Sequence, residues 1–424
     1  MFNTSKGGMI NNILNRFITQ ITLDHVIKDG EYYSDPEEIK IIAVTKAKKW
    51  TRKRSIQPIL YNRWQSRYSS LESIANNTFS SIMDPISKEE LSHVLKHLSN
   101  HKAAGPSGIP NEFWKHAGKH IKETLRTLLN NCLLQNDIPK EWKKASIILI
   151  PKPKNWKGNI DITRLIILIE TARKILTRIL TDRISCICSK QNILKGHNIS
   201  VLRDTNTTVP IHTLNCIAEH AREFKKEAWF IFQDMKKAYN SVEWEALKAL
   251  LIRIKMNPDF IILLENLHNN RTNNIITEFG LSQDYQVEDG LDQRETHSPI
   301  LWRIFYDPLL CEIQEKHSSD GYTLNHKWQP NIQKTTIQNK QFTINHIAFV
   351  DDTCWIANSQ QSALNILNTA HNFFEFVDIE INFDKSEILR IYHTDNILSS
   401  LILDDKKTNI KILDPTQSAR YLEV

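Results

Sequence analysis

Two acidic sites, each beside a short apolar run, constrain the fold of this 424-residue chain most strongly. Asp234 follows the run 229–233, while Asp351 and Asp352 lie between the runs 347–350 and 353–356. Runs of this length are typical of buried strands, and carboxylates beside them are costly unless a cation pairs with them. Hard oxygen ligands favour Mg²⁺. Because the two sites are far apart in the sequence, only the fold can unite them.

Taken alone, each acidic site has a simpler interpretation. Asp234 fits a helix N-cap, and Asp351-Asp352 fits a hairpin turn, because aspartate is common at both places. The alternative is a shared metal site, in which two Mg²⁺ ions about 4 Å apart activate a hydroxyl and stabilise a leaving group. This alternative requires the two acidic sites to lie on neighbouring strands.

The remaining patterns predict a mixed α and β chain. A capping box at Ser87 and Glu90 opens a helix with Leu91, Val94, Leu95 and Leu98 on one face. Further helices are predicted at 112–135, 171–186, 244–254, 298–314 and 361–376. Strands are predicted at 145–150, 228–233, 275–279, 285–288, 341–348 and 353–357. Strands and helices do not alternate regularly, which favours the α+β class over a doubly wound fold.

Composition and charge narrow the function classes. A formal net charge of +6 and a pI near 8.8 permit a nucleic-acid partner. A basic cluster surrounds Trp50, made of Lys46, Lys48, Lys49, Arg52, Lys53 and Arg54. The six cysteines show no paired framework, which indicates reduced intracellular thiols. The sequence has no phosphate-binding G-x-x-x-x-G-K-[ST] loop, no zinc-hydrolase spacing and no apolar run of transmembrane length.

Beyond the carboxylates, a series of segments resembles the motifs of reverse transcriptases from non-LTR (LINE-type) retrotransposons. The segments occur in the order of that family, and they cover about residues 85 to 424. They are 102–110 with Phe113-Trp114, 139–142, 150–152, 164–166, 232–239, 290–293 with 298–301, 348–352, 382–386 and 421–422. Each is weak by itself, and the specificity comes from their ordered occurrence.

The resemblance implies an α+β right-hand polymerase fold, in which an antiparallel palm sheet carries the catalytic aspartates and packs on helices. The implied division is a basic N-terminal extension at 1–85, fingers at 86–200, a palm at 201–415 and the start of a primer grip at 416–424. The polymerase core would span about 134–424. Because the sequence ends at Val424, we expect a thumb to be essentially missing.

The resemblance also implies roles for individual residues. Asp234, Asp351 and Asp352 would be catalytic, and Asp234 and Asp351 would hold two Mg²⁺ ions, with Mn²⁺ as a substitute. The residues expected to bind the dNTP are Lys152, Arg164, Tyr239, Gln293 and Lys385. Those expected to contact template or primer are Lys102, Lys154, Arg178 and Tyr421. The implied partners are an RNA template, a DNA primer and dNTP, without a membrane, and the implied location is the nucleus.

Simpler interpretations of these residues stay open: Tyr239 as a core aromatic, Lys152 and Arg164 as surface charges, and Lys385 as a loop lysine. Several residues depart from the family pattern: Arg294 and Glu423 replace glycines, Leu165 replaces a proline, and Ser107 and Asn240 replace common aspartates, which matters less. We expect Arg294 to obstruct the nucleotide pocket and Leu165 to loosen the backbone that aims Arg164. The main hypothesis is an RNA-directed DNA polymerase, and the alternative is an inactive remnant that retains nucleic-acid binding.

Overall fold

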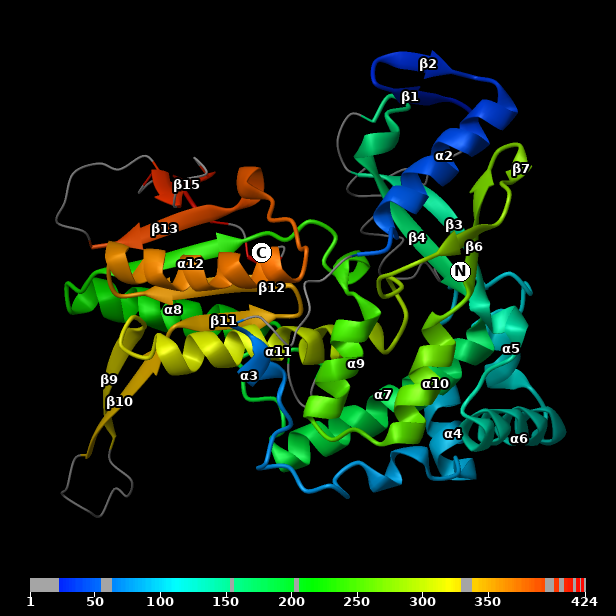
Figure 1. Ribbon diagram of the computed structural model, residues 1–424, viewed down its shortest axis with the longest axis horizontal. Coiled ribbons are helices and arrows are strands. Elements are labelled where there is room, and N and C mark those ends of the chain that lie inside the picture. Colours follow the sequence, from blue (N-terminus) through cyan, green and yellow to red (C-terminus); the bar gives the residue numbers. More distant parts are fainter. Residues whose placement is uncertain are drawn as a thin grey trace, which may run out of the picture.

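The computed structural model describes residues 23–54, 63–152, 156–201, 206–328, 338–392, 400–403, 408–414, 417–419 and 421–422. Its helices and strands follow one another without regular alternation, as predicted for the α+β class. Two larger sheets organise the chain, one on the left and one on the right in Figure 1.

The left-hand sheet has six strands in the order β11-β12-β5-β13-β15-β14. The strands are β5 (Ala228–Gln233), β11 (His346–Phe349), β12 (Asp352–Ala357), β13 (Glu387–Ile391), β14 (Ser400–Leu403) and β15 (Thr408–Ile412). Strand β5 lies between β12 and β13 and is antiparallel to both.

Both faces of β5 are buried, which explains its unbroken apolar sequence. Trp229 and Ile231 belong to a core that includes α11 (Ser298–Lys316) and α12 (Gln360–Phe376). Ala228 and Phe230 belong to a second core with α8 (Thr208–Glu223). Successive side chains of a strand point to opposite faces, so the two sets alternate. Helices α8 and α12 lie along this sheet in Figure 1.

The right-hand sheet has the order β4-β3-β6-β7, with β8 also paired to β6. Its strands are β3 (Lys144–Pro151), β4 (Thr163–Ile169), β6 (Arg271–Thr277), β7 (Gly280–Leu281) and β8 (Tyr285–Val287). Strand β3 is antiparallel to β4 and parallel to β6. The parallel partner comes from a segment that the sequence-based division assigned to the palm.

The N-terminal segment packs on the right-hand sheet. The hairpin of β1 (Val26–Lys28) and β2 (Glu31–Tyr33) is followed by helix α2 (Pro36–Trp50). Asp35 is the N-cap of α2, and its side chain accepts hydrogen bonds from Glu37 N and Glu38 N. Ile39, Ala43 and Ala47 of α2 share a core with β3, β4 and β6. Residues 23–54 therefore belong to the core of this sheet, which their weak periodicity did not indicate.

Most of the remaining α-helices lie below the right-hand sheet in Figure 1, whereas α3 (Gln65–Tyr68) lies beside α11. The longer ones are α4 (Lys88–Lys96), α5 (Asn111–His116), α6 (Lys119–Gln135), α7 (Thr171–Gln191), α9 (Trp244–Arg253) and α10 (Pro258–His268). Shorter turns are α3 (Gln65–Tyr68) and the 3₁₀ helices at 80–83, 140–143, 160–162, 239–241 and 383–385. Ser87 caps α4 by accepting a hydrogen bond from Glu90 N, as predicted. Within the described chain, no helix is both long and apolar enough to cross a membrane.

Two predicted elements are each divided in the structure. The helix predicted at 112–135 is wrong as one unit, because Ala117 and Gly118 adopt extended backbone between α5 and α6. The strand predicted at 341–348 is also wrong as one unit: β10 (Gln338–Ile344) pairs with β9 (Tyr322–Trp328), whereas β11 pairs with β12. Buried Asn345 separates them and donates hydrogen bonds to Ile313 O and His317 O at the end of α11.

Candidate active site

The pairing of β5 with β12 brings the two acidic sites to one end of the left-hand sheet. Thr353 pairs with Gln233, so Asp352 and Asp234 are the next residues beyond this pair on neighbouring strands. Phe349 pairs with Asp352 across the β11–β12 hairpin, which leaves Val350 and Asp351 as the turn. The predicted meeting of the two sites is therefore confirmed.

The turn that carries Asp351 is held in an unfavourable backbone conformation. Val350 has a φ of 60°, which is rare for a β-branched residue and persists only when its surroundings impose it. Asn198 accepts from Val350 N at 3.2 Å and donates to Val350 O at 3.0 Å. The Trp302 indole also donates to Val350 O at 2.9 Å. Sequence reasoning missed Asn198 and Trp302, because no local pattern connects them to a turn so distant in the chain.

The carboxylates influence one another electrically. Burial and the negative charges of Asp352 and Asp234 together raise the pKa of Asp351 to about 6, against a backbone hydrogen bond that lowers it. A carboxyl with this pKa is costly to ionise without a neighbouring cation. The three aspartates therefore concentrate negative charge at the end of β5 and β12.

The segment 382–386, which the sequence singled out, contacts Asp234 directly. Asn382 Nδ2 donates to Asp234 Oδ2 at 2.8 Å, and Asn382 N donates to Asp234 O at 2.8 Å. Lys385 Nζ lies 3.6 Å from Asp234 Oδ2, and Ser386 Oγ accepts from Asp234 N. Lys385 is therefore placed to neutralise part of the charge of Asp234 and to reach groups bound beside it.

The donor chemistry at this end of the sheet fits a divalent cation. Within the described part of the chain, no three His, Cys, Asp or Glu side chains converge closely enough to hold a metal by themselves. Mg²⁺ in phosphoryl-transfer sites commonly uses one or two carboxylates and completes its shell with phosphate and water. Asp234 and Asp351 fit such a pair, because they lie close enough for the charge of Asp234 to raise the pKa of Asp351.

Tyr239 lies between the carboxylates and the core. Its side chain is half-buried, and its ring centroid is 6.1 Å from that of Trp302. Burial raises the pKa of the Tyr239 hydroxyl, and the charges of Asp351 and Asp352 raise it further. The tyrosine is therefore neutral and faces the site, with its backbone carbonyl accepting from Leu291 N at 2.8 Å.

The loop 290–295, which carries Gln293, is fixed by a buried ionic network. Arg173 lies 3.2 Å from Asp292 and 2.8 Å from Glu295, and Arg271 lies 2.7 Å from Asp292. Burial alone would raise the pKa of Asp292, but Arg271 and Arg173 hold it at about 2. Sequence reasoning missed these two arginines. The network places Gln293 Nε2 3.4 Å from Asn240 Oδ1.

Gly290 begins this loop with a φ of 93°, and a Cβ there would lie 2.8 Å from the backbone of Asn240. Only glycine fits both this conformation and this close approach. The loop is therefore pressed directly against the segment that follows Asp234.

The predicted phosphate-binding cations lie at the tip of the β3–β4 hairpin. Arg164 pairs with Ile150, Lys152 N donates to Ile162 O at 2.8 Å, and both side chains are exposed. Lys154 lies outside the described residues.

Lys152 also belongs to a group of lysines around Trp50. The Lys237 ammonium lies 4.2 Å from the Trp50 ring centroid. Desolvation and the charges of Lys46, Lys49 and Lys152 together lower the pKa of Lys237 to about 8, against the charge of Glu380. This group joins the loop after Asp234 to the N-terminal segment.

The predicted template and primer residues fall in two places. Lys102 and Arg178 line one cavity of about 540 Å³. Tyr421 instead lies on the α8 face of the left-hand sheet, with its ring centroid 5.6 Å from that of Phe232. The structure therefore brings Lys102 and Arg178 together and separates Tyr421 from them.

Two departures from the family pattern, Arg294 and Leu165, bear on the expected obstruction and loosening. Arg294 has a φ of 72°, a conformation that favours glycine, and its side chain lines the same cavity as Lys102 and Arg178. Leu165 is buried in β4 and pairs with Leu149, so this part of the backbone is fixed by a regular ladder. The expectation that Leu165 loosens it was therefore wrong. Glu423 lies outside the described residues.

Comparison with known proteins agrees with this geometry. The family profile described as "Reverse transcriptase (RNA-dependent DNA polymerase)" matches residues 150–422. The probable RNA-directed DNA polymerase from transposon BS of Drosophila melanogaster is 24% identical over 54% of this chain and 25% of its own length. The Pol polyprotein from the type-1 retrotransposable element R2 of Popillia japonica is 23% identical over 68% of this chain and 38% of its own length.

A third relative, the RNA-directed DNA polymerase from mobile element jockey of Drosophila melanogaster, is 23% identical over 53% of this chain and 24% of its own length. The similarity thus spans less than two fifths of each of these longer relatives. The matched segment contains β5, the β11–β12 hairpin and all three aspartates. The chain belongs to the reverse transcriptase (RNA-dependent DNA polymerase) family, in the group of non-LTR retrotransposon polymerases.

Proposed function

We propose that this chain is an RNA-directed DNA polymerase that extends a DNA primer on an RNA template with dNTP. The observation that carries the proposal is the β5–β12 register, which sets Asp234 beside Asp352 at one end of the left-hand sheet. A site for nucleotidyl transfer needs carboxylates that meet in space, and the buried strands supply them on a rigid scaffold.

Asp234 and Asp351 would hold two divalent cations, which we infer to be Mg²⁺; these would polarise the primer 3′-hydroxyl and stabilise the pyrophosphate leaving group. Asp352 would add negative charge that favours cation binding. Lys385, close to Asp234, would move toward the departing pyrophosphate and supply a proton or a compensating charge. The Met235 carbonyl would complete the coordination, because the hydrogen bonds of the Met235–Ile381 bridge are made by the backbones of Asp234 and Lys236 instead.

Tyr239 and Gln293 would select the nucleotide. The half-buried ring of Tyr239 faces the carboxylates, where a ribose 2′-hydroxyl would meet it. Gln293, set by the Arg173 and Arg271 network, would lie along the nascent base pair. Lys152 and Arg164 would hold the triphosphate from the hairpin tip, the arginine as a planar fork and the lysine as a point charge.

We further propose that the right-hand sheet and its helices are the fingers and that the left-hand sheet is the palm. The initial division, with an extension at 1–85, fingers at 86–200, a palm at 201–415 and a primer grip from 416, needs one modification. Residues 23–54 and strands β6 and β8 share the core of β3 and β4, and β7 pairs with β6, so we assign them all to the fingers. Template contacts would come from Lys102, Lys154 and Arg178, and a primer contact from Tyr421.

The test is primer extension on poly(rA) with oligo(dT), dTTP and Mg²⁺. Wild-type protein should extend the primer, and Asp234→Asn or Asp351→Asn should abolish extension. The matched control is Asp284→Asn, an exposed aspartate whose ion pair with Lys144 is 3.7 Å long. Extension that survives either active-site change would defeat the catalytic assignment. Template binding without extension by the wild-type chain would favour the inactive-remnant alternative.

A further inference from the structure

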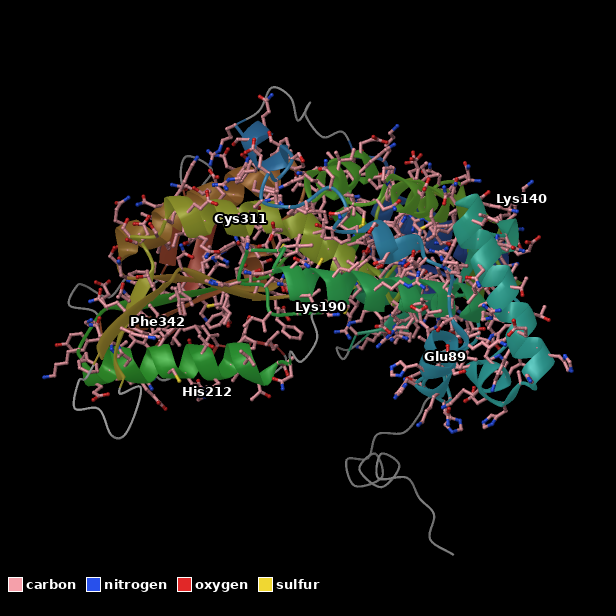
Figure 2. The ribbon with its side chains drawn as sticks, turned by 90° about the horizontal axis from the view of Figure 1, so that it is seen from below. Glu89, Lys140, Lys190, His212, Cys311 and Phe342 are labelled. Atoms are coloured by element: carbon pink, nitrogen blue, oxygen red, sulfur yellow. The ribbon has the colours of Figure 1, made fainter. Side chains whose placement is uncertain are left out.

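The loop 102–110, which lies between α4 and α5 in the chain, packs on the N-terminal end of α7. Gly105 of this loop meets the backbone where β4 ends and α7 begins, and a Cβ there would lie 2.6 Å from Glu170 N. A side chain at this position would collide with the backbone, so only glycine permits the approach. In Figure 2, Glu89 marks α4 and Lys190 marks the opposite, C-terminal end of α7.

A buried carboxylate holds the middle of the loop. Glu170 is 7% exposed; its Oε1 accepts from Ser107 N at 2.7 Å, and its Oε2 accepts from Ser107 Oγ at 2.6 Å. Gly108 N donates to Gly105 O at 2.9 Å, so both Ser107 donors belong to one tight turn. Hydrogen bonds to a carboxylate are short and strong, and two from one residue also fix its orientation. We call these two hydrogen bonds the Glu170 anchor.

Neutral and charged groups around the anchor hold the two ends of the loop. The Thr171 hydroxyl donates to Ile109 O at 3.0 Å and accepts from the Trp114 indole of α5 at 2.7 Å. Glu112 of α5 accepts from His101 N, at the start of the loop. The loop is therefore bound at both ends, and the buried carboxylate adds the contact at its centre.

The anchor explains a departure from the family pattern. Ser107 stands where the reverse transcriptases that this chain resembles commonly have aspartate. An aspartate at 107 would place a second carboxylate against buried Glu170, and two like charges this close are unfavourable. Ser107 supplies hydrogen-bond donors instead, so the two residues match each other chemically. The residue at 170 therefore determines which residue the loop tolerates at 107.

We propose that Glu170 is a positioning residue: by binding Ser107, it sets the loop so that Lys102 meets the template strand. This inference rests on the proposed function, in which Lys102 contacts the template. Glu170 itself is buried and acts only through the loop. It lies at the junction of β4, which carries Arg164, and α7, which carries Arg178, so the anchor also fixes Lys102 relative to these two cations.

The sign of one effect separates this role from general electrostatics. Removing a carboxylate near a nucleic-acid surface strengthens binding, because the phosphates lose a repulsive charge. Removing the carboxylate of Glu170 should instead weaken binding, because Lys102 loses its position. A contribution to stability alone would change neither the preference among nucleic acids nor the salt dependence of a variant that is folded.

The experiment measures equilibrium binding of fluorescent primer–template duplexes to the full chain, in EDTA and without dNTP. One duplex carries an unpaired 5′ RNA overhang and the other is blunt-ended. Urea unfolding verifies that each variant is folded under the assay conditions. The variants are Glu170→Ala, Ser107→Asp, Lys102→Gln, the double variant Glu170→Ala with Lys102→Gln, and the exchanged pair Ser107→Asp with Glu170→Asn.

Two of these proteins control for charge and for additivity. The exchanged pair swaps donor and acceptor and has the net charge of wild type. The double variant tests whether Glu170 acts through Lys102, because residues that act as one unit have non-additive effects. A further control is Glu72→Ala, an exposed glutamate that does not line the cavity of Lys102.

Lys102→Gln should weaken overhang binding about fourfold near 0.15 M salt and reduce the slope of log K against log salt by about 0.7, as for one phosphate contact on a single strand. Glu170→Ala and Ser107→Asp should each weaken overhang binding about two- to fourfold, and the exchanged pair should recover binding to within about twofold of wild type. The double variant should lose no more than Lys102→Gln alone. Blunt-duplex binding and Glu72→Ala should match wild type.

Overhang binding by Glu170→Ala that equals or exceeds wild type would overturn the inference. So would an additive loss in the double variant, an equal loss for the blunt duplex, or a wild-type chain that does not prefer the overhang. If Glu170→Ala is not folded, the exchanged pair decides, and its failure to bind better than Ser107→Asp overturns the inference.

The readout is independent of extension. If Asp234→Asn abolishes extension while Glu170→Ala binds normally, the anchor inference fails alone. If no protein extends a primer but Glu170→Ala loses overhang binding and the exchanged pair recovers it, the proposed function fails alone.

Discussion

Replacing Asp351 with asparagine should stabilise the cation-free protein while it abolishes polymerase activity. Burial and the charges of Asp352 and Asp234 raise the pKa of Asp351 from 3.8 to about 6. The free-energy equivalent of this change is about 3 kcal/mol, which is an upper limit because the side chain retains some contact with water. Asparagine keeps the shape of the side chain and removes the charge. The wild-type residue is thus retained at a cost to stability, as expected where function requires a buried charge.

The sign of the pH dependence follows from proton binding. At any pH between 3.8 and about 6, the folded state binds more protons than the unfolded state, so wild-type stability falls as the pH rises through this window. Above about pH 6 the full cost of ionised Asp351 is present. Below the unfolded value the carboxyl is neutral in both states. Asp351→Asn should therefore gain up to about 3 kcal/mol over wild type at pH 8 and less than about 1 kcal/mol at pH 4.

Urea unfolding followed by tryptophan fluorescence in EDTA measures both differences. Adding Mg²⁺ at pH 8 should stabilise wild type and narrow its gap to Asp351→Asn, because a cation that binds only the folded state shifts the equilibrium toward it. Asp284→Asn, an exposed aspartate, should match wild type in every condition. The reasoning is refuted if Asp351→Asn is no more stable than wild type at pH 8, or if its gain is the same at both pH values.

Three further predictions test the residues around the site. Arg173→Met should lower the free energy of unfolding by about 3–5 kcal/mol, because Glu295 would stay buried and lose its ion-pair partner. In urea unfolding, the double variant Arg173→Met with Glu295→Gln should recover most of this loss, and no recovery would contradict the proposed ionic network. Tyr239→Ala should increase incorporation of ribonucleotides relative to deoxynucleotides in single-nucleotide extension, whereas an unchanged ratio would remove its steric role. Asn198→Ala should leave the Val350 peptide under-bonded, lowering stability by about 1–3 kcal/mol and reducing extension; full activity at saturating Mg²⁺ would contradict a positioning role.

The core of the site could be predicted because its signals are local. The apolar run of β5 and the runs flanking Asp351-Asp352 are long enough to indicate strands, and an acidic residue at a strand end is visible in the sequence. Their meeting required the fold, and the ordered resemblance supplied that expectation. The exact register, in which Thr353 pairs with Gln233, came only from the structure.

Groups that act through distant contacts could not be predicted. The side chains of Asn198 and Trp302 donate hydrogen bonds to the Val350 carbonyl, and a backbone acceptor leaves no trace in the side-chain pattern of its own segment. Helix α2 was missed for a different reason. Two of its three buried residues are alanines, whose small side chains give little contrast between the buried and the exposed face.

The N-terminal segment contacts the loop that carries Gln293, which supports its proposed assignment to the fingers. Thr51 O accepts hydrogen bonds from both Glu288 N and Asp289 N at 3.1 Å, and Arg54 N donates to Asp289 Oδ2 at 2.6 Å. The buried Arg54 guanidinium then donates to Asn240 O, the residue whose side chain meets Gln293. This series of contacts joins the end of α2 to Asn240 and Gln293, which lie on both sides of the proposed nucleotide site. Since buried polar groups that lose their partners are destabilising, the segment 51–54 and the loop 288–293 must keep their positions together. The segment that looked like a basic extension in the sequence is therefore part of the structure that orients Gln293.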